Sequence, residues 1–262
     1  MSKAGSEENA MTLKRLNVLY VAALGLACAL GLTPRVQAQD APQHWPSAMH
    51  DDVVLTKIMI DRLERRDANP DDFTYWEGQA WVGGDVNKLW LKSEGSRVHG
   101  KAEDASLEAY YSRAVAAFWD AQFGVRHDFA AGDAPARNWL GFGFKGLAPY
   151  VFDVDATAYL GGSGRSAARL KAEYNLLLTQ RLILMPEVEF NAYGKEDPER
   201  GLGSGLAESD VALRLRYDIR REFAPYIGVV WTHKYGATAD FARVAGGPVH
   251  DTQYVAGVRA WW

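Results

Sequence analysis

The sequence has little of several features on which common protein classes depend. Of its 262 residues one is a cysteine, Cys28, and 29 basic residues are nearly balanced by 33 acidic ones. A single cysteine excludes a disulfide framework, and the charge balance argues against a nucleic-acid-binding surface. Outside one stretch near the N-terminus, no run approaches the roughly 20 apolar residues of a membrane-spanning helix. The hydrophobic fraction of 48% and the aromatic fraction of 12% are also too high for a disordered chain.

The N-terminal region is typical of an export signal. A short uncharged apolar stretch, Val18–Leu32, follows two basic residues and precedes the segment Val36-Gln37-Ala38. This pattern predicts a secretory signal peptide that is cleaved after Ala38. Cleavage removes Cys28, so the exported chain has no thiolate for catalysis or metal binding. Soft-metal chemistry would then use methionine or histidine.

Motifs of common enzymes are also missing. There is no nucleotide-binding loop and no HExxH, and the Gly-x-Gly at 141–143 lacks the helix that a dinucleotide site needs. From residue 56 onward we find no amphipathic pattern with the 3.6-residue period of a helix. Apolar and polar residues instead alternate with a period of two, most clearly in 167–178, 181–193 and 209–219. The chain is therefore predicted to be all-β.

Twelve antiparallel strands are predicted from this alternation. They cover 56–65, 73–83, 86–93, 105–115, 118–129, 137–145, 149–160, 167–178, 181–193, 209–219, 225–233 and 253–262. Short connections at 84–85, 116–117, 146–148, 179–180 and 220–224 alternate with longer ones at 66–72, 94–104, 130–136, 161–166, 194–208 and 234–252. Bacterial outer-membrane barrels sort their loops in this way, because short turns face the periplasm and long loops face outside. We predict a transmembrane β-barrel at 56–262, after a signal peptide at 1–38 and a periplasmic tail at 39–55.

One face of the predicted strands is charged with both signs, as expected for a polar lumen behind a lipid-facing apolar surface. This predicted lumen network consists of Asp153, Asp155, Lys171, Glu173, Arg214, Arg216 and Asp218, together with Glu187 and Glu189. We expect Glu187 and Glu189 to face Arg214 and Arg216 on one neighbouring strand and Lys171 on the other. The network either stiffens the barrel or lines a path for ions.

Aromatic residues near the predicted strand ends suggest the two interfacial girdles of a membrane barrel. The candidates are Tyr75, Trp76, Trp90, Trp139, Tyr150, Tyr159, Tyr193 and Tyr235. The chain ends with Tyr254, Ala256, Val258, Ala260 and Trp262 in one register. This ending resembles the C-terminal signal of outer-membrane barrels. Residues 253–262 are therefore expected to bind the barrel assembly machinery, with outer-membrane lipid around the finished barrel.

Several long blocks resemble one family, the copper resistance protein B family. They are Trp76–Gly95 (WEGQAWVGGDVNKLWLKSEG), Phe118–Asp128, Gly141–Gly161, Gln180–Glu189, Gly201–Leu206 and Ala224–Gly236. The resemblance runs from about residue 46 to the C-terminus. It implies a bacterial outer-membrane protein that acts in copper resistance, with the copper ion as its ligand and a periplasmic multicopper oxidase as a partner.

Members of this family often carry a segment rich in methionine and histidine before the barrel, and here that segment is short. It holds His44, Met49 and His50, followed by two aspartates. Imidazole and thioether groups suit copper, so these residues are candidate copper ligands. The alternative is a tail that contains them by chance. Within the barrel no histidine or methionine pair has a metal-ligand spacing, and Met185 is a candidate soft contact beside Glu187 and Glu189.

The sequence predicts a non-enzymatic outer-membrane barrel that binds copper or permits its exit from the periplasm. A small general channel without a metal role is one alternative. A membrane-embedded lipid hydrolase is another, and it would need a Ser–His pair on the lipid-facing surface. Ser112 and His127 lie on adjacent predicted strands, but their registers oppose each other.

Overall fold

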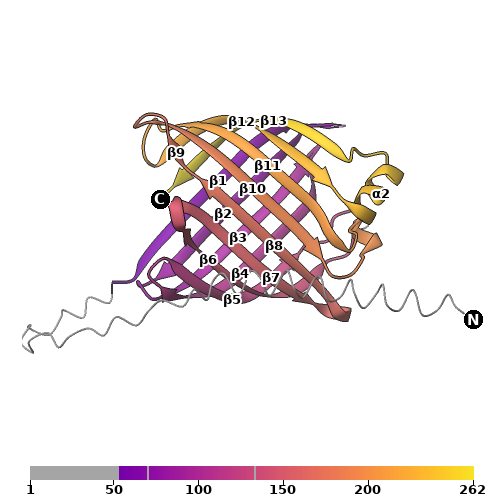
Figure 1. Ribbon diagram of the computed structural model, residues 1–262, viewed down its shortest axis with the longest axis horizontal. Coiled ribbons are helices and arrows are strands. Elements are labelled where there is room, and N and C mark those ends of the chain that lie inside the picture. The colour runs from indigo at the N-terminus through magenta and orange to yellow at the C-terminus, as the bar shows by residue number, and fades with distance from the viewer. Residues whose placement is uncertain (1–52, 70, 133) are drawn as a thin grey trace, which may run out of the picture. The chain divides into compact units, whose positions relative to one another are not determined.

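The computed structural model describes residues 53–69, 71–132 and 134–262, which form one closed antiparallel β-barrel (Figure 1). The predicted signal peptide at 1–38 and most of the predicted tail lie outside these residues. The strands are β1 (Leu55–Asp67), β2 (Phe73–Gly83), β3 (Asn87–Val98), β4 (Lys101–Ala116), β5 (Trp119–Asp128), β6 (Arg137–Ala148), β7 (Phe152–Gly161), β8 (Arg165–Tyr174), β9 (Leu176–Leu177), β10 (Leu182–Tyr193), β11 (Gly205–Tyr217), β12 (Phe223–Lys234) and β13 (His250–Trp261). Four short helices join them: η1 (Pro149–Val151), η2 (Gly162–Gly164), η3 (Pro198–Arg200) and α2 (Gly236–Val244).

Each strand pairs with its neighbours in the chain, and β1 pairs with β13 to close the ring. The short β9 pairs with β10 beside β8, so β8 and β9 are one strand interrupted at Asn175. The barrel therefore has the twelve strands that the alternation predicted. Strand β1 begins and β13 ends at the same end of the barrel, where Ile58 and Trp262 exchange backbone hydrogen bonds of 3.0 and 2.9 Å.

Burial along the strands is the reverse of that in a soluble β-protein. Outward side chains are large and apolar, and Leu89, Phe123, Leu160 and Ile227 are each more than half exposed. Inward side chains are mostly polar or charged and are buried, as Glu64 illustrates. A surface of this kind is stable when lipid covers it and the polar groups are enclosed within the barrel.

A bulge in β1 changes which side chains point inward. The pairing of β1 with β2 shifts between Ile60 and Arg62, and its pairing with β13 shifts between Ile60 and Leu63. An extra residue at a bulge reverses the alternation beyond it. Consecutive residues Asp61 and Arg62 consequently both face the lumen, where Asp61 accepts a hydrogen bond from Gln79.

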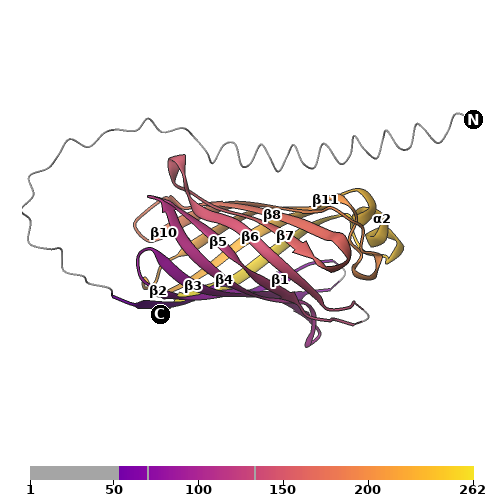
Figure 2. The same ribbon diagram turned by 90° about the horizontal axis from the view of Figure 1, so that it is seen from below.

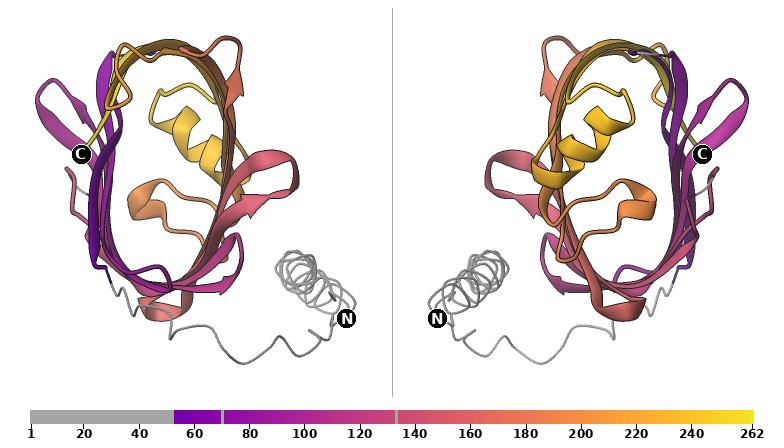
Figure 3. Two further views of the ribbon diagram at one scale, coloured as in Figure 1. Left: turned by 90° about the vertical axis from the view of Figure 1, so that its left-hand side faces the viewer. Right: turned by 90° about the vertical axis from the view of Figure 1, so that its right-hand side faces the viewer.

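The turns at one end of the barrel are short, as predicted, but the loops at the other end are not uniformly long. The predicted loops at 94–104 and 161–166 are wrong, because β3 and β4 continue to a turn at 99–100, and β7 and β8 continue to a turn at 162–164. His99 and Gly100 have φ values of 47° and 83°. Two consecutive residues with positive φ form a turn whose twist matches the flanking strands, so both strands extend to it. The extended hairpins project beyond the ring in Figure 3.

The expectation that no helix follows residue 56 is also wrong. Helix α2 lies between β12 and β13, at the same end of the barrel as the segment 194–204 (Figures 1 and 2). Along the barrel axis, both fall inside the ring of strands (Figure 3). Among the residues that the structure describes, no helix is long and apolar enough to cross a membrane.

Several aromatic residues expected in the interfacial girdles point into the barrel instead. Trp90, Trp139 and Tyr159 are 8%, 7% and 3% exposed. Trp139 donates a hydrogen bond of 2.7 Å from Nε1 to the carboxylate of Asp128. Aromatic rings in the inward register fill lumen space that charged side chains leave open, so position near a strand end did not identify a girdle.

Candidate functional site in the barrel lumen

The lumen contains two cavities that share part of their lining. One, of about 500 Å³, lies at the end with the short turns and is bounded by Lys57, Phe118 and Leu147. The other, of about 570 Å³, lies at the end with the long loops and is bounded by Asn69 and Gly247. We call them the short-turn chamber and the long-loop chamber. The residues common to both linings are Arg62, Glu94, Ser106 and Arg214.

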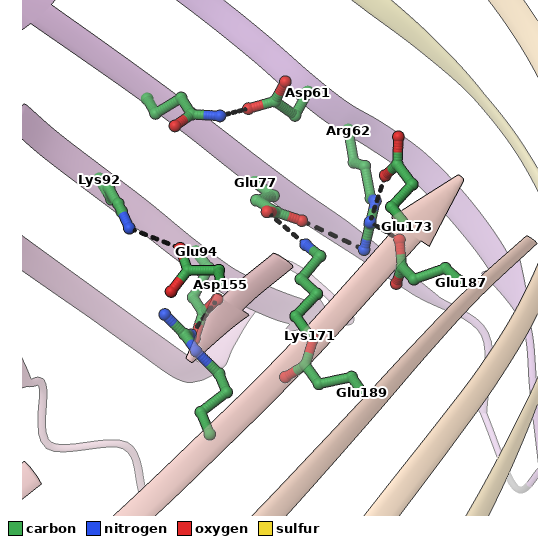
Figure 4. A network of polar contacts seen from close by, with 12 residues as sticks. Asp61, Arg62, Glu77, Lys92, Glu94, Asp155, Lys171, Glu173, Glu187 and Glu189 are labelled. Carbon is green, nitrogen blue, oxygen red and sulfur yellow. Dashed lines mark hydrogen bonds and ion pairs between the residues drawn. The ribbon is translucent and has the colours of Figure 1, made fainter. Parts of the chain in front are cut away.

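Arg62 lines both chambers, and its guanidinium group lies among three carboxylates (Figure 4). It forms ion pairs with Glu77 on β2 at 3.1 Å, with Glu173 on β8 at 3.7 Å and with Glu187 on β10. Lys171 on β8 approaches Glu77 from the opposite wall, with its Nζ 2.6 Å from the carboxylate. Strands β2 and β8 are separated by five strands in the sheet, so this contact crosses the lumen.

Glu64 on β1 extends these ion pairs toward β11 and β12. It accepts hydrogen bonds of 3.2 Å from Arg214 and 2.8 Å from the hydroxyl group of Tyr226. Arg66 lies 2.7 Å from the same carboxylate. The side chain of Glu64 has no exposed surface and that of Arg214 is 3% exposed. A carboxylate so deeply buried needs this set of donors to offset its lost hydration.

A second group of ion pairs crosses the lumen between β3 and β8. Arg169 lies 3.0 Å from Glu94 on β3 and 3.3 Å from Glu108 on β4. Arg126 on β5 also reaches Glu108 at 3.3 Å, and Lys92 pairs with Asp155 at 2.9 Å. We call all of these ion-paired residues the central belt: Arg62, Glu64, Arg66, Glu77, Lys92, Glu94, Glu108, Arg126, Asp155, Arg169, Lys171, Glu173, Glu187 and Arg214.

The belt joins opposite walls, whereas the sequence predicted pairs between neighbouring strands. The predicted facing of Glu187 and Glu189 with Arg214 and Arg216 is displaced, because Glu187 lies opposite Ala212 and Glu189 opposite Asp210. Arg214 still reaches Glu187 diagonally at 3.5 Å. Lys171 lies opposite Glu189 in the register, but its ammonium group points across the lumen to Glu77. Long side chains on a narrow barrel reach the far wall more easily than the alternation alone suggests.

The remaining predicted network residues lie toward the short-turn end. Asp153 and Arg216 line the short-turn chamber. Arg216 pairs with Asp218 at 3.0 Å, just beyond the end of β11. Arg216 also donates toward the sulfur of Met185, with its Nη1 3.3 Å from Sδ.

Two thioethers, those of Met59 and Met185, line the short-turn chamber. They are 9% and 8% exposed. Met59 packs with Trp90 and Tyr110 in a small apolar cluster, against which Trp81 and Trp261 also pack. Met185 was a candidate soft contact together with Glu187 and Glu189, but those two carboxylates line the long-loop chamber, while Met185 lines the other.

The other predicted copper ligands, His44, Met49 and His50, lie outside the described residues. Within 53–69, 71–132 and 134–262, no three His, Cys, Asp or Glu side chains are grouped so that together they could hold a metal ion. The carboxylates of the central belt are engaged by arginine and lysine instead. The chemistry of the lumen is that of a polar path crossed by ion pairs.

A lid covers the long-loop chamber; we use this name for residues 194–204 together with α2. The backbone N–H of Gly203 donates to the hydroxyl group of Thr238 at 2.8 Å, which ties the two parts together. A Cβ atom on Gly203 would lie 2.5 Å from the backbone of α2, so the close approach requires glycine.

Asp197 anchors the lid to the barrel wall. It accepts hydrogen bonds of 2.9 and 3.1 Å from Arg137 at the start of β6, and Arg165 at the start of β8 lies 3.2 Å away. The hydrogen bonds from Arg137 hold the pKa of Asp197 below its ordinary value, although burial opposes this shift. Asp197 is therefore ionised, and the anchor intact, at neutral pH.

The pair that a lipid hydrolase would need is not assembled. Ser112 has no exposed surface and donates to the carboxylate of Asp120 at 3.0 Å inside the barrel. His127 instead contacts Asn138, with 2.6 Å between Nδ1 and the amide oxygen, and packs edge-on against Phe129. The two residues lie on opposite faces of the wall, as their registers predicted.

Sequence reasoning missed most of the central belt, including Arg62, Glu64, Glu77 and Arg169. In β2 and β8 the charged residues lie at alternate, inward-facing positions, and this pattern could have identified them as lumen residues. In β1 the bulge hid the signal, because Asp61 and Arg62 break the alternation. Which residues pair across a lumen depends on the closure of the barrel, which no local pattern contains.

The closed barrel, its apolar outer surface and its ion-paired lumen define an outer-membrane β-barrel protein. A NanC porin has the same fold, with a TM-score of 0.52, 12% sequence identity, and coverage of 78% of this chain and 98% of that chain.

The family described as Copper resistance protein B precursor (CopB) matches residues 54–262, which include the whole barrel. A copper resistance protein B homolog of Pseudomonas syringae pv. tomato is 46% identical over 219 residues, covering 84% of this chain and 74% of the relative. Copper resistance protein B of Escherichia coli is 44% identical over 216 residues, covering 82% of this chain and 72% of the relative. The chain belongs to the copper resistance protein B family.

Proposed function

We propose that this protein contributes to copper resistance as a non-enzymatic outer-membrane barrel that binds copper ions or permits their exit from the periplasm. The observation that carries the proposal is the family match over the whole barrel, with two relatives at 46% and 44% identity that are named for copper resistance. Copper is the cargo in this proposal, and a periplasmic multicopper oxidase is a proposed partner.

The lumen supports an entry point for copper at the short-turn end. Met59 and Met185 place two thioethers on the wall of that chamber, and thioethers favour copper over harder cations. Asp153 and Asp155 line the same chamber, and Asp155 is already paired with Lys92 at 2.9 Å. The central belt lies beyond it, so passage to the long-loop chamber requires the ion pairs around Arg62 to separate.

The proposal is tested by the copper tolerance of a deletion strain, with zinc and silver as control metals. We expect copper tolerance to fall and to return when the intact gene is supplied. Unchanged copper tolerance in the deletion strain contradicts the proposal and favours a small general channel without a metal role. Equal loss of tolerance to all three metals indicates a general permeability defect.

Complementing variants of the full chain separate the tail from the lumen. In one, His44, Met49 and His50 are replaced by alanine; in another, Glu187→Gln is combined with Glu189→Gln. A third carries Met185→Leu. Loss of tolerance with the tail variant assigns binding to the tail, whereas loss with the lumen variants assigns a path through the barrel. Lumen variants that insert, fold and restore full tolerance contradict conduction past these residues.

A further inference from the structure

Two histidines lie side by side on the outer surface of the barrel. His233, next to the end of β12, is directly opposite His250, at the start of β13, in the strand register. The residues adjacent to these histidines on the two strands line the long-loop chamber; they are Thr232, Lys234 and Asp251. Because side chains alternate along a strand, both imidazoles face outward.

The rings of this histidine pair are aimed at each other. Their Nδ1 atoms are 2.5 Å apart, and the ring centroids are separated by 4.0 Å. Tyr235 packs edge-on against His233 at a centroid distance of 4.2 Å and bonds Ser209 through its hydroxyl group at 3.0 Å. One ring is therefore held in place, and its partner is exposed and free to adjust.

The pair lies where the barrel leaves the membrane on the long-loop side. Trp231, the preceding outward residue of β12, is 43% exposed, and Tyr254 on β13 is 64% exposed. Tryptophan and tyrosine on an outer barrel surface mark the membrane interface. The two imidazoles lie just beyond them, within reach of water and dissolved ions.

We propose that His233 and His250 form a copper(II) site on the outer surface of the barrel. Two imidazole nitrogens share one ion when each lies about 2 Å from it, and small side-chain rotations open the present spacing to that geometry. Among divalent first-row ions, nitrogen ligands bind copper(II) most tightly. Water completes the coordination, so the ion exchanges readily with the surroundings.

This site is independent of the lumen and of the proposed role in copper resistance. The residues are separated by 17 positions, so no motif spacing reveals them, and the β12–β13 register alone brings them together. If the deletion strain loses copper tolerance but the His233–His250 pair binds no copper, the proposed function stands and this site is wrong. If the pair binds copper but the deletion strain keeps full copper tolerance, the site stands and the proposed function is contradicted.

The test uses the full chain in detergent micelles, with His44, Met49 and His50 replaced by alanine so that the tail does not contribute. Copper(II) is titrated and followed by electron paramagnetic resonance, which detects coupling to coordinated nitrogen. We expect one copper ion per chain with coupling to two imidazole nitrogens. His233→Asn and His250→Asn, added separately, should each remove one nitrogen and weaken binding by at least the 10- to 100-fold typical of a lost outer-shell partner.

The matched control is His127→Asn, which replaces another outward histidine near the same rim and leaves binding unchanged. A second measurement is the copper-dependent rise in the thermal unfolding midpoint, which the parent chain shows and the His250→Asn variant lacks. Equal copper affinity and equal nitrogen coupling in the parent and in both variants overturn the proposal. Equal loss with His127→Asn overturns it as well, because the binding then does not depend on this pair.

Discussion

The two ends of the barrel differ in what covers the lumen. At one end the strands are joined by short turns, and the chamber inside them is lined by Met59, Met185 and several charged residues. At the other end a lid held by Asp197 lies over a chamber lined by carboxylates such as Glu189. The two ends therefore differ in chemistry: the short-turn end presents two thioethers, and the long-loop end is covered by an ion-paired lid.

The largest expected effect concerns which end faces the outside of the cell. Short turns of outer-membrane barrels face the periplasm, so an epitope inserted within 194–208 or 234–252 should be labelled on intact cells. One inserted at 179–180 should be labelled only after the cells are permeabilised. Labelling of the tag at 179–180 on intact cells would show that the short turns face outside, which reverses the predicted orientation of the barrel.

The next effect concerns the belt between the two chambers. Arg62→Met leaves Glu77, Glu173 and Glu187 without their shared cation. Removing one partner from a buried ion pair costs about 3–5 kcal/mol. We expect a lower unfolding midpoint, measured by heat-dependent electrophoretic mobility, and a higher conductance in planar bilayers.

The control for this variant is Arg65→Met on the same strand. Arg65 faces outward, and its side chain is 58% exposed beside Asp72. Loss of an exposed pair should change stability by at most about 1 kcal/mol. If both variants lower the midpoint equally, the buried ion pairs of the belt stabilise the barrel no more than an exposed pair does.

The smallest effect concerns the lid. Asp197→Asn weakens the hydrogen bonds from Arg137 and the contact with Arg165, and hydrogen bonds to charged groups contribute about 1.5–3 kcal/mol. We expect faster proteolysis within 194–204, whereas Asp240→Asn on the exposed face of α2 should change little.

Acid should release the same anchor. The pKa of Asp197 is lowered in the folded protein, so its contribution is fully present above the ordinary aspartate value of roughly 3.9. That contribution is lost as the pH falls through the lowered value. Proteolysis of the lid should therefore be slow from pH 7 to 5 and accelerate below about pH 4. A proteolysis rate that does not change with pH contradicts the role of Asp197 as an anchor. Equal rates for the parent chain and Asp197→Asn at neutral pH contradict it as well.

Much of the fold was readable from the sequence because each strand carries its own alternation. All twelve strands were found, and β2 was predicted with its observed bounds. The errors fall where a local backbone conformation decides. The positive φ of His99 allowed β3 and β4 to extend, and α2 is too short to produce a convincing helical period.

The candidate site was less readable. The inward orientation of Glu187, Lys171 and Arg214 followed from their register, but their partners did not. Arg62 and Glu187 are separated by 125 positions and meet through four successive strand pairings. The His233–His250 pair was missed for the same reason, because a strand register is not a sequence spacing.

The bulge at Asp61–Arg62 also has a consequence for the order of folding. Strand β1 is made early and β13 last, yet they pair with each other, and their offset includes the bulge. Glu77 lies on the neighbouring strand β2, whereas Glu173 on β8 and Glu187 on β10 reach Arg62 only when the ring closes. Closure of the barrel therefore completes the set of carboxylates around Arg62, and these ion pairs stabilise the closed ring.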